Sequence, residues 1–126
     1  MKQINVSQIT ETVKKLCMDA NYFLNEDIVD RFKKAKEEES FGMAKNIIDI
    51  LMENADIARE EKMPICQDTG MAVVFVEIGQ DVHITGGSIE DAINEGVREG
   101  YEEGFLRKSV VADPINRVNT KDNTPA

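Results

Sequence analysis

The sequence contains no tryptophan and has only one histidine, two cysteines and three prolines in 126 residues. Two cysteines, Cys17 and Cys66, are too few for the disulfide framework of a small secreted domain. No apolar run reaches the 18 residues of a candidate membrane span, and the N-terminus has no continuous apolar stretch typical of a signal peptide. These absences predict a soluble, cytoplasmic protein with no membrane partner.

Basic residues are also scarce. Lysine and arginine total 15 against 24 aspartates and glutamates, which gives a net charge of −9. Such an excess of negative charge argues against non-specific binding to a nucleic-acid backbone, because that binding needs a basic face. The length fits one domain and is too short for two, so residues 1–126 are expected to form a single domain.

The first half of the chain has the periodicity of helices. Apolar residues recur every three or four positions in three segments, and the expected caps of these segments are Ser7, Asn25 and Ser40. The third segment continues to about Lys62, where Pro64 stops it. Residues 1–62 are therefore predicted to be helical, with the charged run at 33–39 on a solvated face.

The second half, residues 63–126, has a mixed pattern. The β-branched and aromatic run AVVFVEI at 72–78 predicts a strand, and a turn at Gly79-Gln80 leads to a return strand at 81–85. This pair is expected to form a short β-hairpin. A helix capped by Ser88 follows, and the tail is rich in residues that favour turns.

Three glycines, Gly96, Gly100 and Gly104, stand four residues apart on this helix. A glycine inside a helix costs about 1 kcal/mol relative to alanine, so three in register indicate a face that another backbone approaches closely. The charged residues between them exclude a membrane-dimerisation face. The predicted fold is α+β: a helix-rich N-terminal half, a short β-hairpin, a Gly-striped helix and an extended tail.

The densest group of reactive side chains is PICQDTG at 64–70, where a long helix gives way to a strand. As a nucleophile, Cys66 would need the only histidine, His83, nearby. A structural zinc site takes four ligands and a cubane iron–sulfur cluster three or four thiolates, but the chain has three cysteine and histidine residues in total. Any metal role of Cys66 therefore requires ligands from outside this sequence, whereas Cys17 lies on an apolar helical stripe and is expected in the core.

Two cations, Arg107 and Lys108, follow the Gly-striped helix in an otherwise acidic chain. Cations at this place complement the helix dipole, which is a purely structural interpretation. Alternatively, the planar guanidinium of Arg107 offers two parallel hydrogen bonds to a carboxylate, and an acidic protein that binds a dicarboxylate needs such a local reversal of charge. Both interpretations stay open at this point.

PICQDTG at 64–70 and GYEEGFLRKSVVADPINRVNTKDNTPA at 100–126 resemble the α-type catalytic domain of the class I, iron–sulfur-dependent fumarases and L(+)-tartrate dehydratases. The resemblance implies a [4Fe–4S] hydro-lyase that adds water to, or eliminates it from, a small dicarboxylate of the fumarate/malate type. By position, Cys66 matches a cluster ligand, and Gln67 and Asp68 match residues beside the substrate. Asp68 is the candidate for proton transfer, and Arg107 matches an arginine that binds a substrate carboxylate.

The resemblance also implies partners. Family α subunits continue past the point that matches Ala126 and carry two further cluster cysteines there, and they work with a β-type subunit. The chain is therefore expected to be a truncated α subunit that lacks the cluster and is inactive alone. Truncation would expose apolar surface, so this chain is also expected to form a homo-oligomer. Two alternatives are a non-catalytic helical interaction module that uses the glycine face, and a cysteine enzyme that uses Cys66 and His83. The motifs do not separate fumarate from tartrate as the substrate.

Overall fold

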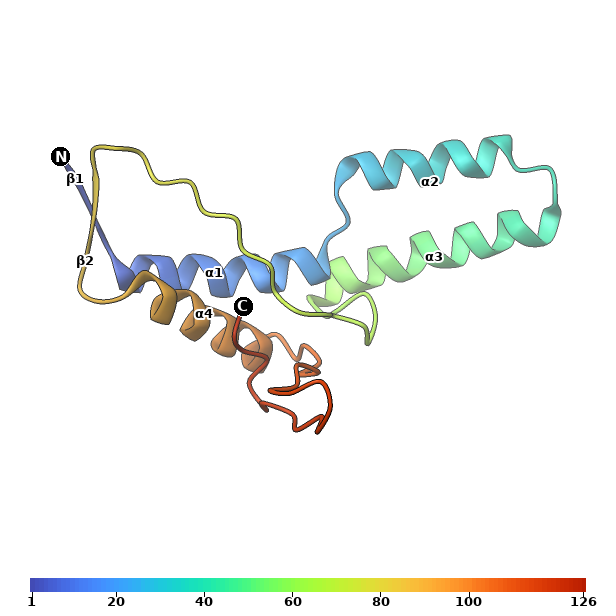
Figure 1. Cartoon of the computed structure of the whole chain (residues 1–126). Helices are drawn as coiled ribbons and strands as arrows, with labels where there is room; N and C mark the ends of the chain where they lie inside the picture. Colours follow the sequence, from blue (N-terminus) through green and yellow to red (C-terminus); the bar gives the residue numbers. More distant parts are fainter.

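The computed structural model describes all 126 residues and contains four helices and one two-stranded sheet (Figure 1). The elements, in chain order, are β1 (Lys2–Asn5), α1 (Val6–Tyr22), α2 (Glu26–Glu38), α3 (Gly42–Glu61), β2 (Val82–Thr85) and α4 (Ile89–Glu103). The α+β class is confirmed, with helices filling most of the first half. β1 was not predicted, and α3 begins two residues later than its periodicity suggested.

The predicted β-hairpin is wrong in its pairing. The return strand forms as β2, but it pairs in parallel with β1 at the N-terminus, with Ile4 opposite Ile84. Residues 72–78 are extended and form no strand. The turn does form, since Val82 N donates to the carbonyl of Gly79 at 3.0 Å, yet the chain leaves it beside β1. Parallel strands need a long crossover connection, here three helices, so a local turn signal could not reveal this partner.

Of the four expected helix caps, only Ser88 forms its capping hydrogen bond, and the N-cap of α3 is Phe41 rather than Ser40. Asn5, not Ser7, caps α1: its side chain accepts from Ser7 N at 3.0 Å, and the side chain of Gln8 accepts from Asn5 N at 3.1 Å. This reciprocal pair is a capping box. Ser88 caps α4 as predicted, whereas Asn25 occupies the N-cap position of α2 without a side-chain hydrogen bond.

The glycine face of α4 packs directly on α1, as its spacing predicted. A Cβ atom built on Gly96 would lie 2.6 Å from the carbonyl oxygen of Thr10, and one built on Gly100 would lie 3.0 Å from that of Lys14. The core is therefore the α1–α4 interface with the turn that follows α4, and its buried members are Val13, Cys17, Tyr22, Val97, Tyr101 and Leu106. Because α1 occupies the glycine face, that face is not open to a partner protein.

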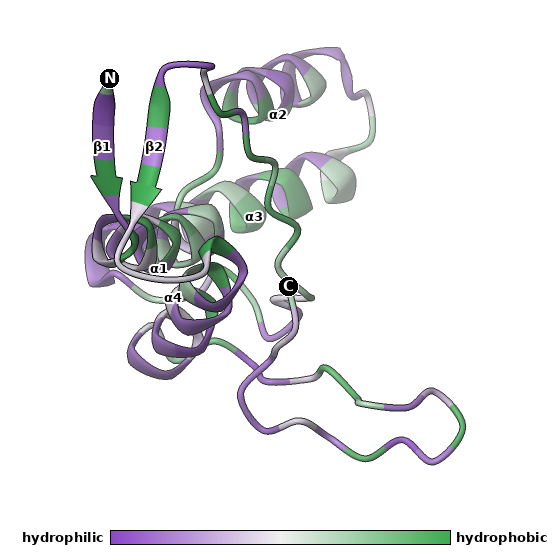
Figure 2. Cartoon of the chain, turned by 60° about the vertical axis from the view of Figure 1, so that its left-hand side comes forward, coloured by the Kyte–Doolittle hydropathy of each residue, from purple (hydrophilic) through white to green (hydrophobic).

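Helices α2 and α3 form an antiparallel pair that projects from the α1–α4 body (Figure 1). α2 has no buried residue, and α3 buries only Ala55 and Ala58. Several apolar side chains of α3 are exposed, and Figure 2 colours parts of this helix as hydrophobic. None of the four helices combines the length and apolar character that crossing a membrane requires.

Candidate functional site

The PICQDTG loop at 64–70 is anchored at the C-terminal ends of two helices. α3 ends at its C-cap Lys62, which adopts a left-handed conformation with φ 51°. The loop then turns toward α1, where Ile65 N donates to the carbonyl of Asn21 at 2.9 Å. The side chain of Asn54 donates to the carbonyl of Ile65 at 2.8 Å. These two bonds hold the loop between α1 and α3.

The side chains of Cys66, Gln67 and Asp68 lie on the exposed part of this loop. Cys66 is a free thiol, and its Sγ lies 3.8 Å from the carbonyl oxygen of Asp68. Cys17 is also free but buried, and burial raises the pKa of its thiol. The prediction that Cys17 belongs to the core is confirmed, and Cys66 is the thiol that is open to a ligand.

Thr69 joins this loop to Arg107, 38 residues later in the chain. The Thr69 hydroxyl accepts from Arg107 N at 2.9 Å and donates to the carbonyl of Arg107 at 3.2 Å. Asp68 is the direct neighbour of Thr69, with Cα atoms about 3.8 Å apart. The structure thereby brings the loop and Arg107 together, which the resemblance required and the sequence spacing could not show. The role of Thr69 was missed at the sequence level.

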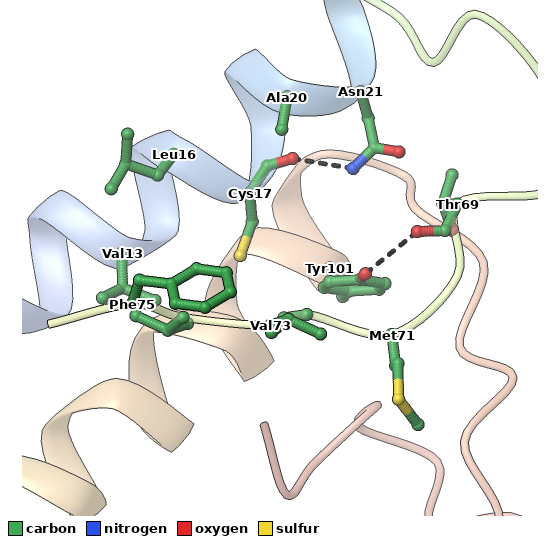
Figure 3. Close-up of a pocket in the computed structure, with 12 residues that line it drawn as sticks. Val13, Leu16, Cys17, Ala20, Asn21, Thr69, Met71, Val73, Phe75 and Tyr101 are labelled. Carbon is green, nitrogen blue, oxygen red and sulfur yellow. Dashed lines mark hydrogen bonds between the residues drawn. The ribbon is translucent and has the colours of Figure 1, made fainter.

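Tyr101 supports the loop from below (Figure 3). Its hydroxyl lies 3.2 Å from the carbonyl oxygens of both Thr69 and Gly70 and donates to this pair. Gly70 has φ +63°, a left-handed conformation that glycine adopts without steric cost. Tyr101 is almost fully buried in the α1–α4 core, and this burial raises the pKa of its phenol. The neutral phenol is therefore a fixed donor that ties the end of the loop to the rigid core.

Asn123 is fully buried and links the tail to the end of the PICQDTG loop. Its side-chain oxygen accepts from Ser109 N at 2.8 Å and from Val110 N at 3.0 Å. Its side-chain nitrogen donates to the carbonyl of Gly70 at 3.1 Å. One amide side chain thus fixes the end of the PICQDTG loop against the segment that follows Arg107. Sequence reasoning placed Asn123 in a turn-rich tail and within the segment that resembles the family, and gave it no role of its own.

The two cations after α4 differ in their surroundings. Lys108 forms an ion pair with Glu102 on the last turn of the helix, so it has the structural role expected near a helix C-terminus. The side chain of Arg107 is exposed and takes part in no ion pair. The structural interpretation therefore fits Lys108, and anion binding by Arg107 stays a prediction.

Cys66 and His83 are not brought together. His83 lies in β2 opposite Gln3, at the start of α1, while the PICQDTG loop contacts the C-terminal end of that helix at Asn21. A helix of 17 residues is about 25 Å long, so these places are at opposite ends of it. The geometry contradicts the cysteine–histidine enzyme, which needs a hydrogen bond between the two side chains.

The metal-ligating side chains of this chain can fill one ligand position of a metal cluster, but they cannot form a complete metal site. Cys66 offers an exposed thiol, and no three histidine, cysteine, aspartate or glutamate side chains are grouped so as to hold a metal ion. A cubane cluster takes three or four thiolates. Cys66 can therefore serve as a single ligand of a cluster whose other ligands lie outside these residues.

Asp122, beside Asn123, is expected to make stability depend on pH. Thr124 N donates to its carboxylate at 3.0 Å, and this bond, together with those from the Thr124 hydroxyl and Arg98, lowers its pKa from 3.8 to about 2. Because the folded pKa lies below the unfolded one, the carboxylate stabilises the fold above pH 3.8, and that contribution is lost as the pH falls to about 2.

Urea unfolding followed by circular dichroism between about pH 5 and pH 2 measures this loss. The Asp122→Asn variant should lose less stability than the wild type over this range. Asp56→Asn, on an exposed position of α3, is the matched control and should retain the full loss. A parallel loss in wild type and Asp122→Asn would contradict the assignment to Asp122.

Known proteins are similar to this chain over most of its length. The fumarate hydratase (Fumerase) family pattern matches residues 10–126. The L(+)-tartrate dehydratase subunit alpha of Escherichia coli K12 is 30% identical over 123 residues, which are 98% of this chain and 40% of that protein. A Methanocaldococcus jannaschii protein, provisionally named as the same subunit, is 37% identical over 117 residues, or 92% of this chain and 41% of that protein.

The chain thus spans about 40% of the length of these curated relatives. The family match includes the PICQDTG loop, Arg107 and Asn123, the residues that the structure gathers at one place. The chain belongs to the fumarate hydratase (Fumerase) family.

Proposed function

We propose that this chain is part of a hydro-lyase that reversibly adds water to a small dicarboxylate of the fumarate/malate type. The observation that carries the proposal is the pair of hydrogen bonds between Thr69 and the backbone of Arg107. It joins the backbone of Arg107, whose exposed guanidinium has no ion-pair partner, to the loop residue that directly follows the exposed Gln67 and Asp68. The names of the relatives, which are tartrate dehydratase α subunits, support the same class of reaction.

Each residue has a chemically suitable role. The guanidinium of Arg107 donates two parallel hydrogen bonds to one substrate carboxylate and offsets the negative field of a chain with net charge −9. The amide of Gln67 both donates and accepts, so it can orient the substrate. The carboxylate of Asp68 is the proposed base that moves a proton at the carbon next to the departing hydroxyl.

We further propose that Cys66 supplies one thiolate ligand of a [4Fe–4S] cluster, whose other ligands come from polypeptide outside these 126 residues. When bound, such a cluster supplies Lewis-acid activation of the substrate hydroxyl. On this proposal the isolated chain is inactive, and activity belongs to a cytoplasmic assembly of a longer α polypeptide with a β-type subunit. The residues named here do not distinguish fumarate from tartrate.

The test is an anaerobic assay of the complete assembly with fumarate, malate and tartrate. Cys66→Ser should remove bound iron and visible absorbance and abolish turnover, while Asp68→Asn should lower kcat by roughly 100-fold or more at similar KM. Reconstitution of the 126-residue chain alone should give neither a stoichiometric cluster nor dehydration of malate. Turnover by that chain, or none by the complete assembly, would show the proposal to be wrong.

The proposed role of Arg107 in carboxylate binding can be tested against a matched control at the neighbouring Lys108. Arg107→Gln should raise KM for the dicarboxylate by roughly 10-fold to 100-fold, because a charge-assisted pair contributes about 1.5–3 kcal/mol. Lys108→Gln removes the same charge from a side chain already paired with Glu102 and should change KM by less than about threefold. Equal effects of the two variants would indicate general electrostatics rather than a carboxylate clamp.

A further inference from the structure

Thr69 contributes the only side chain of the PICQDTG loop that forms a hydrogen bond to another part of the chain. Elsewhere the loop is anchored through its backbone alone. Ile65 bonds to α1 and α3 through its N–H and its carbonyl. Tyr101 donates to the carbonyl oxygens of Thr69 and Gly70 (Figure 3). The Thr69 hydroxyl is therefore not needed to hold the loop in its path.

The backbone of Arg107, in turn, has no hydrogen-bond partner other than Thr69. Its N–H and its C=O both bond to the one hydroxyl, with oxygen distances of 2.9 Å and 3.2 Å. The hydroxyl thus does for Arg107 what a partner residue does in a sheet, where a hydrogen-bonded pair exchanges both bonds. The guanidinium forms no hydrogen bond or ion pair within the chain, so only the backbone orients this side chain.

The neighbours of Arg107 are held independently of Thr69. Leu106 is buried in the α1–α4 core, and Ser109 N donates to the side-chain oxygen of Asn123 at 2.8 Å. Loss of the Thr69 hydroxyl would therefore leave the path of this segment intact and release only the peptide groups of Arg107. Because Arg107 is exposed, water can replace the lost partner, and the stability of the fold should fall little.

We propose that Thr69 is a positioning residue for substrate binding, whose hydroxyl fixes the backbone from which Arg107 reaches a substrate carboxylate. The inference rests on the proposed function, in which Arg107 binds one carboxylate of a dicarboxylate. A guanidinium donates two parallel hydrogen bonds to a carboxylate in one planar arrangement, so a loosened backbone weakens that pair. Threonine suits this role because its β-branched side chain has a restricted χ1 angle, which holds the hydroxyl in place.

Steady-state kinetics of the complete assembly with malate test this role. Thr69→Val keeps the branched shape and removes the hydroxyl, so KM should rise by roughly 5-fold to 20-fold while kcat changes by less than about threefold. Thr69→Ser retains the hydroxyl and should keep KM within about threefold of the wild type. Thr12→Val is the control, because Thr12 is exposed on α1 and loses a bond to the carbonyl of Gln8 instead. Its KM and kcat should stay within about twofold of the wild type.

A double variant shows whether Thr69 acts through Arg107. When Thr69→Val is added to Arg107→Gln, KM should rise by less than about twofold beyond that of Arg107→Gln alone. An unchanged KM in Thr69→Val, or a larger rise in the double variant, would overturn the proposal. A wild-type assembly without turnover would instead show that the proposed function is wrong.

Amide hydrogen exchange in the 126-residue chain, followed by NMR, tests the contact itself without substrate. In Thr69→Val the Arg107 amide loses its acceptor and should exchange at least about tenfold faster than in the wild type. In Thr69→Ser it should stay within about threefold of the wild type. The amide of Val97, in the core of α4, is the internal reference and should not change in either variant. An Arg107 amide that exchanges equally in wild type and Thr69→Val would contradict the proposal whatever the kinetics show, and this outcome is independent of the proposed function.

Discussion

Replacing Gly96 with valine is expected to destabilise this chain by roughly 3 kcal/mol or more, the upper end of what an overpacked core costs. A Cβ atom at Gly96 would lie 2.6 Å from the carbonyl oxygen of Thr10 and 2.8 Å from the Cβ of Val13. Both atoms belong to α1 and cannot rotate away as the end of a long side chain would. The two helices must therefore separate, and this separation also weakens the bond from the Thr10 hydroxyl to the carbonyl of Ala92 at 3.1 Å.

Alanine at the same position separates the steric effect from helix propensity. Gly96→Ala gains about 1 kcal/mol of propensity but adds the same Cβ atom, so a net loss is expected. Gly42→Ala is the matched control, because a Cβ at this first residue of α3 would meet no atom within 4 Å. It should stabilise the chain by a few tenths to about 1 kcal/mol. Urea unfolding followed by circular dichroism measures both, and a gain for Gly96→Ala would contradict the close approach of α4 to α1.

The helices and the glycine face could be predicted because their signals are local. A periodicity of three and four residues reports on a helix within itself, and the spacing of Gly96 and Gly100 requires only that some backbone lie against it. The partner of a strand cannot be predicted from such local signals. β2 pairs with a segment at the other end of the first half, and no pattern in residues 72–85 names that partner. The same reason explains why the run at 72–78 was predicted as a paired strand and is not one here.

The candidate site also has parts that the sequence predicted and a contact between them that it could not predict. From its residues alone, Cys66 had three open roles, and only the resemblance to a family selected a cluster ligand and added Gln67 and Asp68. The sequence pattern had already raised Arg107 as one of two interpretations, and the resemblance selected the carboxylate-binding one. What the sequence could not provide was the contact between the two halves of the site. Thr69 is an ordinary threonine in the sequence, and its pairing with the backbone of Arg107 exists only once α4 has packed on α1. Buried asparagine is also uncommon, so nothing in the tail predicted the position of Asn123.

Replacing Asn123 with alanine is expected to cost about 2–4 kcal/mol, because it leaves Ser109 N and Val110 N without their acceptor and the carbonyl of Gly70 without the Asn123 donor. Asn123 also has φ 61°, a left-handed conformation that asparagine tolerates better than alanine. The loss should fall on the site more than on the helices, since these three bonds join the PICQDTG loop to the tail. Urea unfolding gives the stability, and hydrogen–deuterium exchange of residues 107–110 gives the local effect.

The control variant is Asn116→Ala. Asn116 is an exposed asparagine of the same tail, and its side chain makes no hydrogen bond within the chain. The control should change the free energy of unfolding by less than about 0.5 kcal/mol. Asn123→Asp adds a sharper distinction. Its carboxylate can still accept from Ser109 N and Val110 N, but it repels the carbonyl of Gly70 and places a buried charge next to Asp122. The aspartate should therefore keep the 107–110 amides protected and release the loop end at Gly70. Asn123→Ala and Asn123→Asp are then compared by hydrogen–deuterium exchange of residues 107–110 and of the loop end at Gly70. If the two variants raise exchange equally in both segments, Asn123 is a general packing residue and not the link that holds Arg107 beside the loop.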